Sequence, residues 1–374
     1  MVQKTNLNDS YSIIKEKKIS YGKLFSFIIF VYISLRINRY GEFGNDAMAH
    51  LSIFYLISKF IYLDPNKIDS YNKILFLSVF SFLNKSFMIF AFVIPAYLFF
   101  KTKFNYKRKL FNLSIFFLGL WLVKNIFISG CAIYPVKYSC IENLKWVDIK
   151  DVSYESTKGE AWAKAWPQNQ NKSLTQSEFN KEFNWVESWL IENKNIFIKK
   201  LSPFLIFLIL FVLFFRGTYS VKKIDKQKKY ILLLFSVIGT IYFFIKFPTY
   251  RYGYSYLIVL LSILTLNIFS KVNYEKIFRF FKLTLIVLLV GLILKNAQRI
   301  SKYYDVRSIL PNDRYLSKIQ QNQVQKIFLS KEFYYYLLPG RECRYFKSPC
   351  THIVELNNLK TKKILSYNII LKRD

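Results

Sequence analysis

The hydropathy pattern of this chain consists of long apolar runs separated by short polar segments. Nine runs fit membrane spans, at residues 24–37, 49–63, 72–83, 86–100, 110–128, 200–216, 230–246, 253–270 and 282–296. Hydrophobic residues make up 53% of the sequence, and their gathering into runs excludes an ordinary soluble domain. We therefore predict an all-α polytopic membrane protein with about nine transmembrane helices.

The region 71–100 needs a break between its two runs. If it were one long helix, the basic loop 101–109 would fall outside the cell, against the rule that positive loops stay in the cytoplasm. Two short or re-entrant helices that meet near Asn84 and Lys85 remove this conflict. Non-helical backbone at that depth is tolerated only where protein or water covers it.

The basic residues set the orientation. Loops 101–109 and 216–229 each carry a net charge of +5, and loop 271–282 carries +3, so we place all three in the cytoplasm together with residues 1–23. The run 24–37 is expected to be a retained anchor, since no cleavage site follows it. Topology thus explains much of the net charge of +32, and we expect a lipid bilayer and no nucleic acid as partner.

The largest polar segment between spans, 129–199, is expected outside the membrane. Residues 129–195 carry eight Lys against nine Asp and Glu, and they hold five of the six tryptophans. Cys131 and Cys140 are close enough in sequence for a small disulfide loop. The tryptophans suit either an interfacial belt or a platform for a sugar ring. Residues 179–198 have apolar positions at helical spacing, which predicts a helix along the membrane surface.

Residues 297–374 form a polar tail, and its charge and the number of preceding spans place it on opposite sides of the membrane. Its basic excess favours the cytoplasm, whereas the count of spans and the pair Cys343 and Cys350 favour an oxidising exterior. Long segments translocate largely regardless of charge, so we predict a small extracytoplasmic domain with a second disulfide. A metal site at these cysteines is the weaker alternative, because only His352 accompanies them.

The candidate chemistry begins at NRYGEFGNDAMAH, residues 38–50, between the first two spans. Asp46 is expected in the first turn of a helix, where the helix dipole favours a carboxylate, and His50 follows four residues later on the same face. We take Asp46, His50 and Glu42 as catalytic candidates. The alternative is structural: Asp46 caps the helix and His50 lies at the interface.

Arg251 is the second candidate, in the short outer turn KFPTYRYGYSY at 246–256. An arginine at the membrane edge is unfavourable without an anionic partner, and its guanidinium fork matches phosphate. A lipid head group or an internal carboxylate would serve equally well, so these alternatives stay open.

Several segments resemble one family in combination: GNDAMAH, WLVKNIFISGCAIYP at 121–135, EAWAKAWP at 160–167, PTYRYG and CRYFKSPCT. The chain is similar to bacterial inner-membrane proteins related to the GT-C glycosyltransferases. The resemblance implies transfer of a sugar from a polyprenyl-phosphate donor to a cell-envelope acceptor at the outer face of the inner membrane. Asp46 and Glu42 would be the carboxylates, and the substrate would be bound by Arg251, Lys124, Trp162 and Trp166. The basic opening segment departs from the family and indicates a truncated or divergent member.

Two other classes of function compete with this interpretation. One is a surface-polysaccharide polymerase or ligase, which is disfavoured because residues 129–195 contain no Arg and no His. The other is a non-catalytic membrane scaffold. The chain has no Walker loop, no Rossmann glycine pattern and no HExxH. The sequence identifies no cofactor, leaves a divalent cation open, and gives no oligomeric state.

Overall fold

The computed structural model describes residues 20–36, 45–63, 68–101, 109–144, 146–169, 171, 173–220, 224–268, 271–272, 274–302, 325–328, 334–337, 350–351, 359–364 and 367–372. Contacts divide the chain into two compact units, Met1–Gly291 and Leu292–Asp374, and each is described by itself. Glu42 and Cys343 lie outside the described residues, so the roles predicted for them stay predictions.

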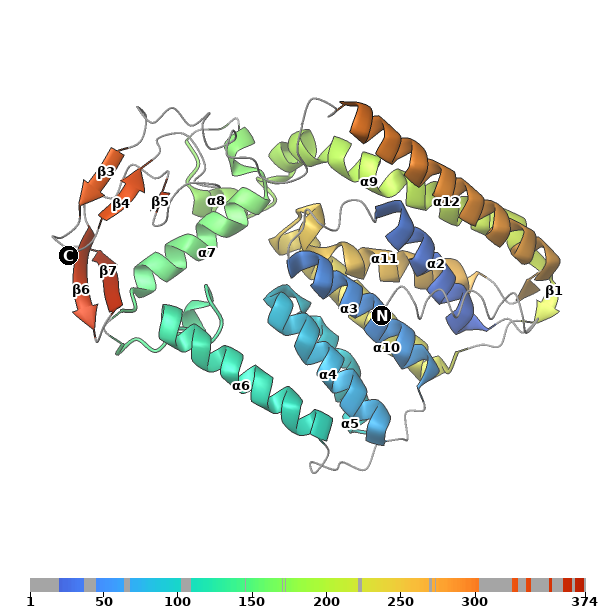
Figure 1. Cartoon of the computed structure of the whole chain (residues 1–374), viewed down its shortest axis with the longest axis horizontal. Helices are drawn as coiled ribbons and strands as arrows, with labels where there is room; N and C mark the ends of the chain where they lie inside the picture. Colours follow the sequence, from blue (N-terminus) through green and yellow to red (C-terminus); the bar gives the residue numbers. More distant parts are fainter. Residues whose placement is uncertain are drawn as a thin grey trace. The chain divides into compact units, whose positions relative to one another are not determined.

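Each of the nine apolar runs falls on a helix (Figure 1). In chain order these are α2 (Tyr21–Arg36), α3 (Asn45–Tyr62), α4 (Ile68–Asn84), η2 (Ser86–Phe92) with α5 (Val93–Phe99), α6 (Lys109–Ser129), α9 (Val186–Phe215), α10 (Lys226–Lys246), α11 (Tyr250–Asn267) and α12 (Tyr274–Lys302). Hydropathy therefore located the helices, because an apolar segment in a bilayer must satisfy its backbone hydrogen bonds internally and does so by forming a helix.

Four helices of the described chain are long and apolar enough to cross a membrane, at Lys109–Ser129, Val186–Phe214, Lys226–Lys246 and Arg279–Gln298. The chain is accordingly a helical membrane protein, while the count of nine spans stays a prediction. Helices α2, α3 and α4 have 16, 18 and 17 residues. At about 1.5 Å per residue they reach roughly 24–27 Å, slightly less than a hydrocarbon core of about 30 Å.

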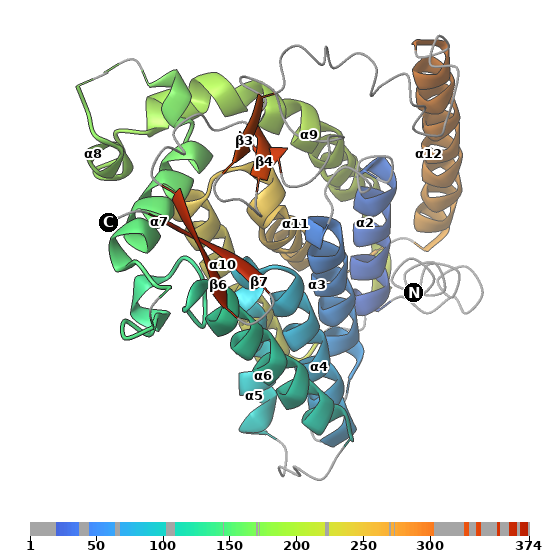
Figure 2. The same cartoon turned by 60° about the vertical axis from the view of Figure 1, so that its left-hand side comes forward.

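Helix α2 is central to the first unit, since its side chains are buried almost all round from Tyr21 to Ser34. Phe27 packs against Phe207 of α9 and Phe281 of α12, with ring centroids 5.8 and 4.9 Å apart. Helices α3 and α11 also contact α2, and α4 packs beside α3 (Figure 2). An apolar helix with no polar face fits this place inside a bundle.

Helices α10 and α11 approach closely because two glycines lie between them. A Cβ added at Gly239 would overlap the ring of Tyr256, and one added at Gly253 would overlap the ring of Phe243. This close contact fixes the start of α11, where Arg251 is located.

The break predicted near Asn84 and Lys85 is confirmed. Helix α4 ends at Asn84, Lys85 has extended backbone, and η2 begins at Ser86. Ser78 of α4 donates a hydrogen bond to the carbonyl of Ala91 at 3.1 Å, so the short helices pack against each other. The side chain of Lys85 at the break is 9% exposed, so protein covers most of this non-helical position, as the membrane environment requires.

The outer segment contains α7 (Ile149–Ala163), α8 (Gln176–Asn180) and the short 3₁₀ turns η3 (Lys137–Ser139) and η4 (Trp166–Gln168). The Cys131–Cys140 disulfide is present, with an S–S distance of 2.01 Å. Helix α9 runs unbroken for 30 residues, past Pro203, so most of the predicted surface helix and the sixth span form one helix, and the placement of its first part along the membrane surface stays a prediction. Its polar first half and apolar second half suggest two elements in the sequence, but the helix continues through the change of composition and past Pro203.

The described strands are short. In the first unit β1 (Arg216–Ser220) pairs with β2 (Lys271–Val272). The remaining strands belong to the second unit: β3 (Gln325–Phe328), β4 (Tyr334–Leu337) and β5 (Cys350–Thr351) form one sheet, and β6 (Leu359–Ile364) pairs antiparallel with β7 (Tyr367–Lys372). The architecture is thus mostly helical, with a little sheet that the all-α prediction did not include.

Candidate functional site

A cluster of three charges joins the ends of three structural segments. Arg251, in the first turn of α11, donates from Nε to Oδ2 of Asp46 at 2.9 Å. Lys85, between α4 and η2, donates from Nζ to Oδ1 of the same carboxylate at 2.7 Å. Asp46 therefore bridges two cations, and the cluster keeps a net charge of +1.

The three side chains of the cluster differ in how much solvent, or a ligand, can reach them. Asp46 is 13% exposed and Lys85 is 9% exposed, whereas 51% of Arg251 is exposed. Lys85 also donates to the carbonyl of Arg251 at 3.2 Å and lies 4.3 Å from the ring centroid of Tyr252. The lysine is thus the enclosed half of the cluster, and the arginine is the half that a ligand can reach.

His50 is fully buried and lies beneath this cluster. Its Nε2 donates to the carbonyl of Arg251 at 2.8 Å, because a carbonyl can only accept. Its Nδ1 is 2.9 Å from the hydroxyl of Ser255, and its ring stacks on Tyr254 at 3.7 Å. Both nitrogens of His50 are therefore engaged with α11, and its described hydrogen bonds are to Ser255 and Arg251 rather than to Asp46, which shares its helix face.

One of the partners considered for Arg251, an internal carboxylate, is present in the structure. This carboxylate is that of Asp46, which lies 205 residues away in sequence. Lys85 was missed as a site residue. The signal that pointed to Arg251, a lone cation at the edge of an apolar run, was equally present at Lys85 but was interpreted only as a helix break.

A second charged group ties the outer segment to the turn before Arg251. Glu160 of α7 accepts from Lys164 at 2.7 Å and from Lys246 of α10 at 3.2 Å. Thr249 donates to the carbonyl of Ala163 at 3.1 Å. The segments EAWAKAWP and PTYRYG, noted separately in the sequence, are thus in contact.

Lys164 is 1% exposed, and its ammonium also donates to the carbonyl of Asn180 at 3.1 Å. Burial lowers the pKa of Lys164 below its ordinary 10.5, while the hydrogen bond and charge of Glu160 raise it. The tryptophan Trp189 adds a further tie, since its Nε1 donates to the carbonyl of Pro248 at 2.7 Å. Together with the contacts of Lys246 and Thr249, this hydrogen bond connects residues 246–249 to α7 and α9.

The other predicted substrate-binding residues are dispersed. Trp166 packs edge-on against Phe179 at 5.0 Å and belongs to the small core of the outer segment. Trp162 is exposed, and the ammonium of Lys124 lies 5.9 Å from the ring of Trp121 on α6. No described contact brings Lys124, Trp162 or Trp166 to the Asp46 cluster.

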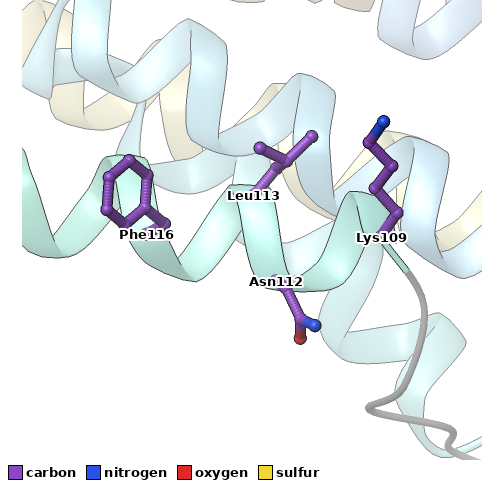
Figure 3. A pocket seen from close by; sticks show the side chains of 4 residues that line it. All are labelled: Lys109, Asn112, Leu113 and Phe116. Atoms are coloured by element: carbon purple, nitrogen blue, oxygen red, sulfur yellow. The ribbon is translucent and has the colours of Figure 1, made fainter.

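Two hollows of about 520 Å³ occur on the described surface. One is lined by Lys109, Asn112, Leu113 and Phe116, all from α6, and Figure 3 shows Lys109 and Leu113 pointing to one side of the helix and Asn112 to the other. The other lies in the outer segment, between α7 and the start of α8. Neither is lined by a predicted site residue.

The Asp46 cluster has unused hydrogen-bonding capacity. A carboxylate can accept about four hydrogen bonds, and two of those of Asp46 are accounted for. Arg251 uses only Nε, and neither of its terminal nitrogens has a hydrogen-bond partner among the described residues. The cluster can therefore accept a proton donor at Asp46 and bind an anion at Arg251. In the described part of the chain, no three His, Cys, Asp or Glu side chains are grouped to hold a metal ion.

Comparison with protein families matches residues 6–258 to the family described as "Domain of unknown function (DUF8201)". This range is more than half of the chain, and it contains Asp46, Lys85, Glu160 and Arg251. No curated protein and no solved structure matched significantly.

Proposed function

Because the chain belongs to the DUF8201 family, whose description assigns no activity, we propose a function from its own residues: a membrane glycosyltransferase-like enzyme. It would transfer a sugar from a polyprenyl-phosphate donor to a cell-envelope acceptor at the outer face of a bacterial inner membrane. The full set of nine spans in a GT-C-like arrangement is part of this proposal.

The observation that carries the proposal is the Asp46 cluster, in which a carboxylate and a half-exposed guanidinium lie 2.9 Å apart. Sugar transfer from a lipid phosphate needs a base for the acceptor hydroxyl and a cation for the departing phosphate. Both groups are present at one end of a helical bundle. That end is where an amphiphilic donor would present its phosphate.

In the proposed step, the acceptor oxygen forms a bond to the anomeric carbon while the bond from that carbon to the phosphate oxygen breaks. The acceptor proton passes to Asp46, and the electron pair of the broken bond leaves with the polyprenyl phosphate. Arg251 binds the leaving phosphate through its terminal nitrogens. Lys85 and His50 position Asp46 and the start of α11, respectively, through the contacts given above.

The test is transfer by the purified full chain in lipid nanodiscs, with a panel of polyprenyl-phosphate sugars. Asp46→Asn should lower turnover per folded molecule by about two to four orders of magnitude. The matched control is Asp148→Asn, because Asp148 caps α7 from an exposed position and an amide still caps. Equal turnover by wild type and Asp46→Asn would remove Asp46 from the mechanism.

A second variant separates binding from chemistry. Arg251→Lys keeps the charge but loses the bidentate fork, so the KM for the donor should rise more than kcat falls. Absence of transfer by the wild type with every donor in the panel would favour the scaffold alternative.

A further inference from the structure

Arg36, the last residue of α2, is a second cation near the start of α11 that the proposed mechanism does not use. Its guanidinium carbon lies 5.6 Å from the ring centroid of Tyr250. Its Nη2 atom is buried and has no hydrogen-bond partner among the residues that the structure describes. Among the described residues no carboxylate forms an ion pair with Arg36.

This orphaned donor calls for a ligand. Burying a charged donor removes its hydrogen bonds to water, which costs free energy unless a new partner replaces them. Most buried polar atoms in folded proteins are accordingly hydrogen-bonded. The position of Arg36 in the last turn of α2 lets it interact favourably with the helix dipole. The dipole accounts for a cation at this place but leaves the Nη2–H bonds unmade.

A second cation faces the same ring. The ammonium of Lys200, from α9, lies 5.0 Å from the ring centroid of Tyr250. The distance between Arg36 and Lys200 therefore cannot exceed the sum of their two distances to this ring. Tyr250 is held firmly: its hydroxyl is 2.7 Å from that of Tyr32, and its ring stacks on Tyr254 at 5.3 Å. Two cations near one fixed ring make the local potential positive, which favours an anion that contacts both of them.

This pair is distinct from the Asp46 cluster. Arg36 and Lys200 come from α2 and α9, whereas Asp46 and Lys85 come from α3 and the α4–η2 break; the link between the two groups is α11, in which Tyr250 precedes Arg251. Lys200 also lies where the apolar half of α9 begins, which is the level at which lipid phosphates meet a membrane helix.

We propose that Arg36 and Lys200 form a second anion site that takes the phosphate group of a lipid. The guanidinium supplies the directed hydrogen bonds, including Nη2, and the ammonium supplies a further charge. The inference stands independently of any transfer activity at Asp46.

Native mass spectrometry of the full chain released from nanodiscs tests this proposal by counting retained lipids. Discs would contain phosphatidylcholine alone, or with phosphatidylglycerol, or with a polyprenyl monophosphate. We expect Arg36→Gln to lower retention of a phosphate lipid at least fivefold, and Arg36→Lys to lower it less. Lys199→Gln is the matched control, since Lys199 is exposed and adjacent to Lys200, and it should behave as wild type.

The two lipid arms distinguish the sources of the phosphate. Loss of retention with both lipids would assign a general head-group site, and loss with the polyprenyl lipid alone would assign a carrier site. Formation of the Cys131–Cys140 disulfide in each variant, checked by peptide mapping, serves as the folding control. Unchanged retention of both lipids by folded Arg36→Gln would overturn the proposal. So would a thermal stability in phosphatidylcholine discs that falls equally in Arg36→Gln and Glu42→Gln, because that result assigns Arg36 to an internal ion pair.

Discussion

The two ion pairs of Asp46 should differ sharply in their contribution to stability. Lys85 is 9% exposed, and breaking such a buried pair by removing one partner typically destabilises by about 3–5 kcal/mol. Arg251 is 51% exposed, and exposed pairs contribute about 0.2–1 kcal/mol. We therefore expect a coupling energy of about 2–3 kcal/mol between Asp46 and Lys85, and of at most about 1 kcal/mol between Asp46 and Arg251.

The assay is a pair of double-mutant cycles that share Asp46→Asn. One cycle combines it with Lys85→Met and the other with Arg251→Met, so that each replacement keeps most of the apolar side chain. The free energy of unfolding would be measured by SDS titration of protein in mixed micelles. Each cycle isolates the pairwise term from the effect of the single substitutions.

The reasoning would be refuted by equal coupling energies, or by a larger value for Arg251. Either result would mean that solvent exposure does not rank these pairs. A large coupling to Lys85 with full transfer activity in Lys85→Met would confine the lysine to a structural role. Salt gives an independent check, since only the exposed pair should weaken noticeably as ionic strength rises.

Three further predictions concern packing, the disulfide and the outer segment. Gly253→Ala should destabilise by about 1–3 kcal/mol in the same SDS titration, because its methyl group would overlap a phenylalanine ring of α10, and a wild-type value would contradict this packing. Replacing Cys131 and Cys140 together by serine should lower the free energy of unfolding by about 2–3 kcal/mol. Wild type treated with reductant should be about as stable as this variant, and equal stability of the variant and the untreated wild type would contradict the prediction. Hydrogen bonds from Thr175 lower the pKa of the Glu178 carboxyl below 4.5, so the capping box stabilises α8 above that pH and is lost as the pH falls through the lowered pKa. Carbon-detected NMR titration should show this pKa rising partway toward 4.5 in Thr175→Val, because the hydrogen bond from the backbone N–H of residue 175, the larger cause, remains; an unchanged value would exclude the side-chain hydrogen bond as a cause.

Much of the helical scaffold could be predicted from the sequence because the bilayer imposes a simple rule on it. All nine apolar runs became helices, and the break at Lys85 followed from loop charge alone. The Cys131–Cys140 pair followed from proximity in sequence. In each of these cases the deciding interaction was local, or was with the membrane.

The partners within the site could not be read in the same way. A spacing of four residues placed Asp46 and His50 on one face of α3, but it did not say what would pack against that face. The partners of His50 are Ser255 and the carbonyl of Arg251, more than 200 residues away. Helical periodicity determines the face of α3 on which a side chain lies, whereas its contact partner depends on packing between segments far apart in the sequence.

The unbroken α9 shows a second limit. Its polar first half and apolar second half suggested two elements, because composition changes near Lys200. Helix continuity depends on backbone hydrogen bonds and not on polarity, so a change of composition does not by itself end a helix, and α9 continues even past Pro203.

The position of Lys85 just after α4 has a consequence for how the chain enters the membrane during synthesis. A charged side chain in an inserting segment raises the insertion free energy by about 2.5–3.5 kcal/mol at mid-span on translocon scales. Asp46 lies at the start of α3 and Lys85 directly follows the end of α4, so the two residues meet at the open end of the α3–α4 hairpin and can neutralise each other once both helices have been synthesised. Arg251 is translated 166 residues after Lys85 and then meets a carboxylate that is already in place. Because Lys85 is synthesised before Arg251, Lys85 is the first of the two cations that can neutralise Asp46 during membrane insertion.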